Sequence, residues 1–100
     1  MAAALTHEEV SKHLNTKFRI HVNETDAIDA QLTDVSELLA SPRQERFSIL
    51  FRTANEPFLG QGMRRFEHEQ MESFELFIVP IGRDEEGTNY EAVFNRIVKT

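Results

Sequence analysis

The chain has 100 residues, enough for one domain with one modest hydrophobic core, which excludes a separate regulatory module. Apolar residues make up 40% and charged residues 28%, a globular balance that excludes disorder along the whole chain. The net charge is −6, from 11 Lys and Arg against 17 Asp and Glu, which disfavours binding to nucleic acid.

Cysteine is absent, so disulfides and thiolate metal sites are excluded, and a reducing compartment suits the chain. No apolar run approaches the ~20 residues that span a bilayer. The opening MAAAL has neither a basic region nor a long apolar core, so it does not predict a secretory signal. We therefore expect a cytoplasmic protein that does not contact membranes, with a single domain over residues 1–100 and a frayed start at residues 1–4.

The first element in chain order is a helix over residues 6–14. Thr6 can accept a hydrogen bond from the backbone of Glu9 while Glu9 reaches back, which is the pattern of a capping box. The apolar face of this helix is small, with Val10 near its centre, and Asn15 is suited to a left-handed stop. Such a helix is expected to pack as a plug on something larger.

A β domain is predicted over residues 17–98. Its first two strands, KFRIHV at 17–22 and AIDAQL at 27–32, alternate apolar and polar residues and are joined by a short polar turn, which predicts a hairpin. Val35 is one residue out of phase with the second strand. A bulge near Thr33 and Asp34 would accommodate this slip.

Two further strands are predicted in the middle of the chain. RFSILFR at 46–52 alternates clearly, whereas MRRFEHE at 63–69 is the least apolar strand, and we place it at a sheet edge where charges deter unwanted pairing. Between them, Pro57 and the glycines that follow predict a turn-rich connection.

The last two strands are apolar on both faces. FELFIVP at 74–80 is expected to end its ladder at Pro80, which has no N–H, and YEAVFNRIV at 90–98 is expected to pair with it. The acidic segment between them predicts a long loop in which Gly87 supplies a positive φ. A strand with two apolar faces must be covered on both. We favour a cover formed by the N-terminal helix and the loop at 57–59 over one formed by a second copy or a partner.

Six short strands, one helix and no alternation of strand and helix predict a mainly β fold. The architecture expected is an antiparallel barrel of about six strands, or a two-layer roll, with a short N-terminal α-helix.

Several stretches together resemble a small bacterial domain family of unknown function. They are LTHEEVSKHLNTKFRIHV, FSILFR, FLGQGMRRFEH and LFIVPIGRDEEGTNYEAVFN, which cover nearly the whole chain. The resemblance implies a free-standing domain of about this length. Members of such families are sometimes encoded beside phage-tail-collar-like proteins, so the resemblance also implies a part in an assembly and a location in a phage-like particle as an alternative to the cytoplasm. It implies no activity and no catalytic residue.

Catalytic and metal-binding patterns are not found. On a strand, His68 points opposite to Glu67 and Glu69, so EHE does not converge on one ion. The acidic segment near Asp84 lacks the spacing of an EF-hand loop, and no serine lies in a G-x-S-x-G sequence. We therefore expect no enzyme, no metal and no cofactor.

Two functions remain from different classes. The first is a protein-interaction or assembly domain that binds a protein partner or self-associates into a homo-oligomer. Its expected contact residues are apolar and lie on the second face of the last hairpin and in the middle loop: Phe58, Leu59, Phe77, Val79 and Val93. The alternative is a small barrel that carries an apolar ligand in an interior lined by Phe47, Phe51, Phe74 and Phe94.

Overall fold

The computed structural model describes residues 6–97, with the side chains of residues 6–95. In this part of the chain, one short helix precedes seven strands. The elements are α1 (His7–Ser11), β1 (Lys17–His21), β2 (Ala27–Val35), β3 (Leu39–Ser41), β4 (Gln44–Thr53), β5 (Gly62–His68), β6 (Met71–Asp84) and β7 (Gly87–Ile97).

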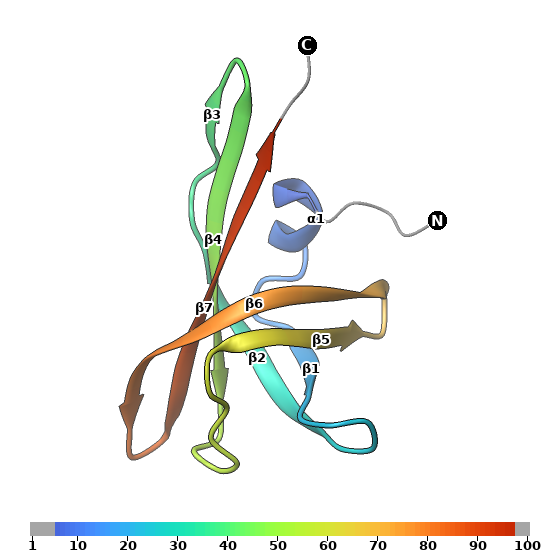
Figure 1. Ribbon diagram of the computed structural model, residues 1–100, viewed down its shortest axis with the longest axis vertical. Helices are drawn as coiled ribbons and strands as arrows, with labels where there is room; N and C mark the ends of the chain where they lie inside the picture. Colours follow the sequence, from blue (N-terminus) through green and yellow to red (C-terminus); the bar gives the residue numbers. More distant parts are fainter. Residues whose placement is uncertain (1–5, 98–100) are drawn as a thin grey trace.

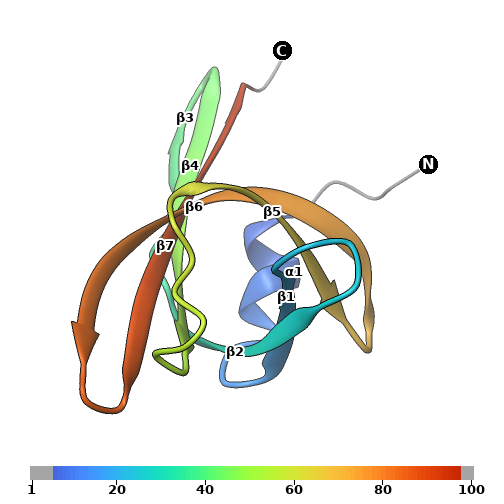
Figure 2. The same cartoon turned by 60° about the horizontal axis from the view of Figure 1, so that its bottom comes forward.

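The strands form one antiparallel sheet in the order β2-β1-β5-β6-β7-β4-β3. A further pairing of β2 with β4 joins the two sides of this sheet, so six strands close into a barrel and only β3 lies outside it. The prediction of a six-stranded antiparallel barrel with a short helix is therefore confirmed. Figures 1 and 2 show that β3, the start of β4 and the end of β7 protrude from the barrel as an arm.

Alternating side chains of all six barrel strands fill the interior. Aromatic rings meet there at close range: Phe18 and Phe51 have ring centroids 5.3 Å apart, and Phe66 lies 4.9 Å from Phe51 and 5.3 Å from Phe74. Aromatic pairs at such separations add to the free energy gained from burial alone. The remaining buried core residues are Val10, Ile20, Ala30, Leu32, Phe47, Ile49, Leu59, Leu76, Ile78, Tyr90 and Ala92.

Local signals in the first third of the sequence predicted the structure well. Thr6 caps α1 by accepting from the Glu9 N–H at 3.1 Å, and Asn15 has a φ of 68°, as expected for a left-handed stop. β1 and β2 form the predicted hairpin, and the register of β2 shifts between Leu32 and Asp34, where the bulge was expected. The helix is shorter than predicted, because it ends at Ser11.

Two predictions about strands were wrong, and one strand was not predicted. β5 is not an edge strand, because it pairs with β1 on one side and β6 on the other. Strand β6 does not end at Pro80 but continues to Asp84. Pro80 has no N–H to donate to the ladder, and a bulge between Pro80 and Gly82 accommodates this break in the hydrogen bonding. β3, which has 3 residues, was not predicted because so short a segment carries no periodic pattern.

The expected long acidic loop is instead a tight turn between β6 and β7. Asp84 pairs with Gly87, so only Glu85 and Glu86 connect the strands. The Asp84 carboxylate accepts from the backbone N–H groups of Glu86 and Gly87 and from Arg52, and these contacts hold its pKa below its ordinary value. The geometry of the turn is thus set by one side chain.

Gly87 does not adopt the predicted positive φ. It is needed for another reason, because a Cβ at this position would lie 2.5 Å from the backbone oxygen of Thr53. The hairpin of β6 and β7 therefore packs against the end of β4 at a distance that only glycine permits.

We predict that Gly87→Ala destabilises the protein by about 1–3 kcal/mol, because the backbone of β4 or β7 must shift to admit the methyl group. Urea unfolding followed by circular dichroism measures this change. Gly60→Ala is the matched control, since a Cβ at Gly60 would meet no atom within 4 Å. Equal free energies of unfolding for the two variants would contradict the close-packing argument.

Candidate functional site

The five predicted contact residues do not form one surface. Phe77 and Val93 are each 48% exposed and Phe58 is 51% exposed, whereas Leu59 is 2% exposed. Leu59 lies in the core because its backbone N–H donates to the buried hydroxyl of Tyr90 at 2.9 Å, so including it among the contact residues was wrong. Val79 is half-buried.

Phe77 and Val93 come together on the outside of the barrel. The register of β6 with β7 pairs Ile78 with Ala92 and Val79 with Glu91. Phe77 and Val93 are the next residues along, one on each strand, and side chains that alternate along a strand direct both away from the interior. The expected cover by α1 and the loop at 57–59 is not present among the described residues, so this prediction was wrong.

Two more exposed apolar residues extend this surface to neighbouring strands. Met63 on β5 is the register partner of Phe77, and Leu39 on β3 lines a groove of about 480 Å³ together with Val93. We call Leu39, Val93, Phe77 and Met63 the outer band. It crosses β5, β6 and β7 on the barrel and continues, beyond β4, to β3 in the arm. Glu37, Arg46 and Glu91 line the same groove as Leu39.

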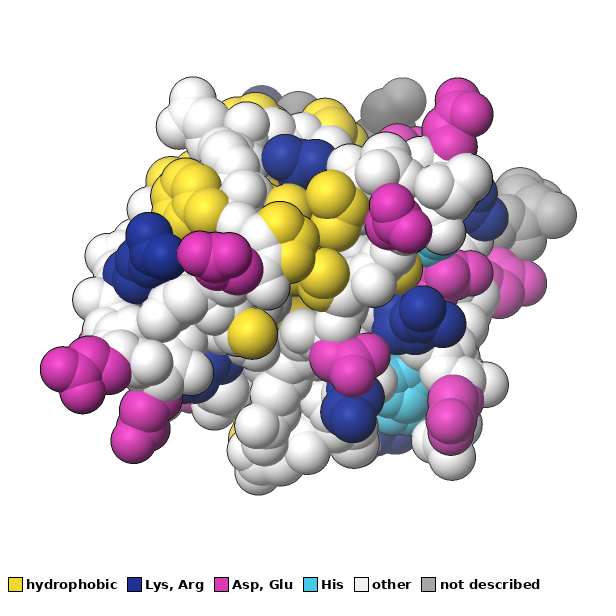
Figure 3. All heavy atoms as spheres, turned by 90° about the horizontal axis from the view of Figure 1, so that it is seen from below, with side chains coloured by type: hydrophobic (Ala, Val, Ile, Leu, Met, Phe, Trp, Pro, Cys, Tyr) yellow, Lys and Arg dark blue, Asp and Glu magenta, His cyan; other side chains and the backbone are white. Residues whose placement is uncertain are grey.

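Phe58 belongs to a different surface at the end of the barrel where the β4–β5 connection lies. Its ring lies 6.4 Å from the ring of Tyr90, and the guanidinium of Arg83 lies 5.7 Å from its centre, a cation–π contact. Seen from this end, hydrophobic side chains gather in groups between acidic and basic ones (Figure 3). Phe58 is thus held by its own chain although half of it is exposed.

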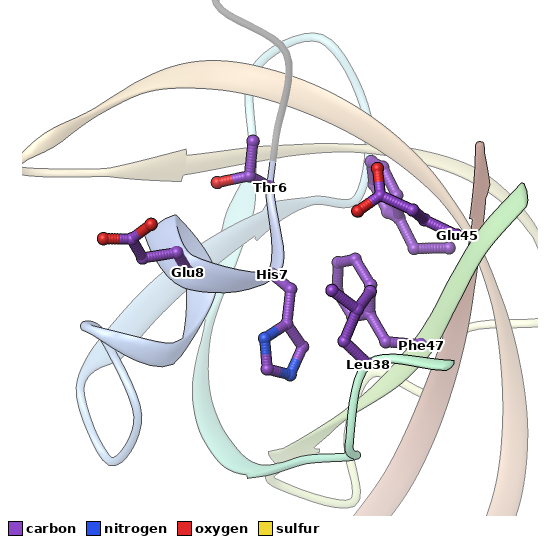
Figure 4. Close-up of a pocket in the computed structure, with 7 residues that line it drawn as sticks. Thr6, His7, Glu8, Leu38, Glu45 and Phe47 are labelled. Carbon is purple, nitrogen blue, oxygen red and sulfur yellow. The ribbon is translucent and has the colours of Figure 1, made fainter. Parts of the chain in front are cut away.

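A hollow of about 250 Å³ separates α1 from the protruding arm. Figure 4 shows His7 of α1 beside Leu38 and Phe47 in this hollow. The His7 ring contacts the edge of Phe47 at 5.1 Å, and its Nε2 donates to the Ser36 carbonyl at 2.7 Å. These two contacts join α1 to the segment between β2 and β3 and to β4.

His68, His13 and Thr16 form a polar cluster at the edge of the core. His68 Nδ1 accepts from the Gln70 N–H at 3.0 Å, so its Nε2 carries the proton and donates to the Thr16 hydroxyl at 2.9 Å. That hydroxyl donates in turn to the His13 carbonyl, and the two imidazoles lie 4.4 Å apart. Burial and the neighbouring His13 lower the pKa of His68 from its ordinary 6.5.

Glu67 faces the opposite way from His68, as the alternation of a strand requires. Its carboxylate accepts from His21 Nε2 at 2.6 Å, and this hydrogen bond lowers the pKa of Glu67. Among residues 6–97, no group of three or more His, Cys, Asp or Glu side chains is arranged to hold a metal ion. Within the same range, no helix has the length and apolar character needed to cross a bilayer.

Arg64 of β5 is half-buried and reaches two backbone carbonyls. Its terminal nitrogens lie 3.5 Å from the Val22 carbonyl and 3.4 Å from the Gly60 carbonyl, which are long hydrogen bonds. Its Nε is buried and has no hydrogen-bond partner. Arg64 is not among the residues that line the hollows described here.

Comparison with known proteins identifies the family. The model of a domain of unknown function, DUF6916, matches residues 5–94, so the chain belongs to this family, and the resemblance to a small domain family of unknown function is confirmed. No curated protein and no solved structure matches the chain.

We predict that His68→Gln flattens the pH dependence of stability. The folded-state pKa of His68 is depressed, so the unfolded chain binds the proton first and the free energy of unfolding falls as the pH drops through the ordinary pKa of 6.5. Protonation at Nδ1 would also break the bond from the Gln70 N–H. Unfolding titrations of both proteins between about pH 7.5 and pH 5 measure the difference, over the range in which a histidine changes charge. Parallel curves would show that His68 does not carry this dependence.

Proposed function

We propose that this member of the DUF6916 family is a non-enzymatic protein-interaction or assembly domain that binds a protein partner through the outer band. The observation that carries the proposal is the exposure of Phe77 and Val93 at adjoining positions of β6 and β7. Outward positions of an antiparallel sheet in water are normally polar, and contiguous exposed apolar residues are typical of interaction sites.

The shape of the outer band suggests what kind of surface would bind it. Because the band follows the curvature of the barrel from β5 to β7 and then continues to β3 in the arm, a partner has to be concave or to wrap around the sheet. The groove between Leu39 and Val93 can hold an apolar side chain of the partner. At its rim, Glu37 and Glu91 carry negative charge and Arg46 carries positive charge, so polar groups of the partner with complementary charge would be favoured.

The described polar groups argue for binding rather than chemistry. Three histidines form hydrogen bonds that hold segments of the chain together. His7 bonds to the Ser36 carbonyl, His21 to the Glu67 carboxylate and His68 to the Thr16 hydroxyl. A surface hollow of about 750 Å³ lies beside Thr16, Glu67 and His68. Both ring nitrogens of His68 are nevertheless engaged, one by the Gln70 N–H and the other by the Thr16 hydroxyl, which leaves neither free to act as an acid or base.

No observation favours the alternative function, a carrier of an apolar ligand. Of the residues expected to line its interior, Phe51 packs on Phe18 and Phe66, and Phe74 packs on Phe66. Phe47 and Phe94 stack on each other at 5.1 Å and line the surface hollow beside α1. The hollows described above open on the surface. The sequence resemblance suggests one candidate for the protein partner, a component of a phage-tail-like assembly.

We predict that Phe77→Asp abolishes partner binding and leaves the fold intact, because the substituted side chain is half exposed and contributes little to the core. The tagged protein is purified from its native host, co-eluting proteins are identified, and binding is repeated with the purified partner. Phe58→Asp is the matched control, since Phe58 has similar exposure but lies outside the outer band.

Circular dichroism and thermal unfolding of both variants accompany the binding measurement. Loss of the partner with Phe77→Asp and its retention with Phe58→Asp support the proposal. Unfolding of Phe77→Asp would instead assign this residue to the core, and equal binding by both variants would rule out the outer band as the contact surface.

A further inference from the structure

The helix α1 lies outside the sheet and buries only one of its side chains, that of Val10 (Figures 1 and 2). At its start, His7 contacts β4 and the segment before β3. Beyond its end, His13 is buried, and its ring lies 4.4 Å from the ring of His68 on β5. The attachment of this helix to the strands therefore depends on a histidine side chain near each of its ends.

His68 joins three segments of the chain at the end of β5. Its Nε2 donates to the Thr16 hydroxyl at 2.9 Å, its Nδ1 accepts from the Gln70 N–H at 3.0 Å, and its ring lies 4.5 Å from the buried ring of Phe18. This arrangement requires a neutral imidazole, because Nδ1 accepts a hydrogen bond only when it carries no proton. A proton on Nδ1 would set two donors against each other and place a positive charge beside His13.

Solvent can supply that proton, because half-buried His68 lines the polar surface hollow of about 750 Å³. Burial and His13, on the side of α1, disfavour the charged form and lower the pKa of His68 from its ordinary 6.5, whereas Glu69 opposes them. The other charged residues that line the hollow are two cations and two anions: Lys17, Arg19, Asp29 and Glu67. Their charges balance, so the contact with α1 is what keeps His68 neutral.

The backbone provides a hinge between α1 and the strands at Asn15, which has a left-handed φ of 68°. Its N–H donates to the Leu32 carbonyl at 2.7 Å, and the Leu32 N–H donates to the Thr16 carbonyl at 3.1 Å. These bonds extend the ladder of β1 and β2 as far as Asn15. In the described part of the chain, the backbone of residues 7–14 makes no backbone hydrogen bond to a strand. This segment can therefore move away without breaking the sheet.

We propose that protonation of His68 releases residues 7–14, which include α1, from the barrel in acid while the strands stay paired. Release returns the charged imidazole to water and separates it from His13. It also uncovers Val10 and the side of Phe47 that faces His7 (Figure 4), so apolar area that is buried at neutral pH becomes accessible. The inference rests on the contacts of α1 and does not depend on the outer band.

Amide hydrogen exchange of the full chain between about pH 7.5 and pH 5, corrected for the intrinsic pH dependence of exchange, tests the proposal. The pKa of His68 is lowered while α1 is attached and returns toward 6.5 on release, so the released state binds the proton more tightly and gains population as the pH falls through 6.5. Residues 7–14 are expected to lose protection about tenfold or more, since one pKa unit corresponds to a tenfold change in the equilibrium. Peptides from β4 and β7 are expected to keep theirs.

An NMR titration of the His68 ring is run on the same protein and is expected to have the same midpoint as the change in residues 7–14. His68→Gln can still accept from the Gln70 N–H and donate to the Thr16 hydroxyl but cannot take up a proton. It is expected to protect residues 7–14 equally at both ends of the pH range. His21→Gln is the matched control and is expected to behave like the unmodified protein, because half-buried His21 is bonded to Glu67, which faces away from His68.

Protection of residues 7–14 that does not change with pH, or that changes as much in His68→Gln, would overturn the proposal. Equal loss of protection in α1 and in the strands would also overturn it, since that is global unfolding, and so would a midpoint that differs from that of the His68 ring. These last two outcomes are measured on the unmodified protein, so the proposal is tested even where circular dichroism shows His68→Gln to be unfolded. None of these outcomes affects the binding test with Phe77→Asp, so the two proposals can fail separately.

Discussion

The pairing of β2 with β4 is the constraint on which the rest of the structure depends. Without it, the strands would form an open twisted sheet with β2 and β3 at its two edges. The contacts Leu32 to Phe51 and Val35 to Ile49 join the sheet to itself, and the bulge between Leu32 and Asp34 lets β2 bend enough to reach β4. Closure turns one face of every barrel strand into a shared interior.

That interior is small, and the chain fills it with aromatic rings. Phe18, Phe51 and Phe66 come from three different strands and meet near its centre. A six-stranded barrel has little space beyond that required by its own side chains. Recognition by this protein is therefore expected to take place on its outside, where the arm and the outer band add surface that the core does not use.

More of the fold than of the candidate site could be predicted from the sequence, because the fold depends more on patterns among neighbouring residues. The cap at Thr6, the left-handed Asn15 and the bulge after Leu32 are each readable from a few neighbouring residues. The position of β5 inside the sheet and the continuation of β6 past Pro80 depend on strands that lie far away in the sequence, so no local pattern could indicate them. Alternation placed Phe77 and Val93 on the second face of the last hairpin, but only the closed barrel shows that this face remains exposed. Leu59 was misplaced because its partner, the Tyr90 hydroxyl, lies 31 residues away.

Strand β6 pairs with a different strand on each of its two edges. Its first part pairs with β5 and its last part with β7, and the two ladders overlap at Ile78, which pairs with both Gly62 and Ala92. Fraying that begins at the turn after Asp84 can separate β6 from β7 one pair at a time. At Ile78 it must break ladders on both sides of the strand, and the side chain there is fully buried. We therefore expect the barrel to open in two cooperative units that meet at Ile78, and we expect the backbone amide of Ile78 to exchange with solvent only on global unfolding.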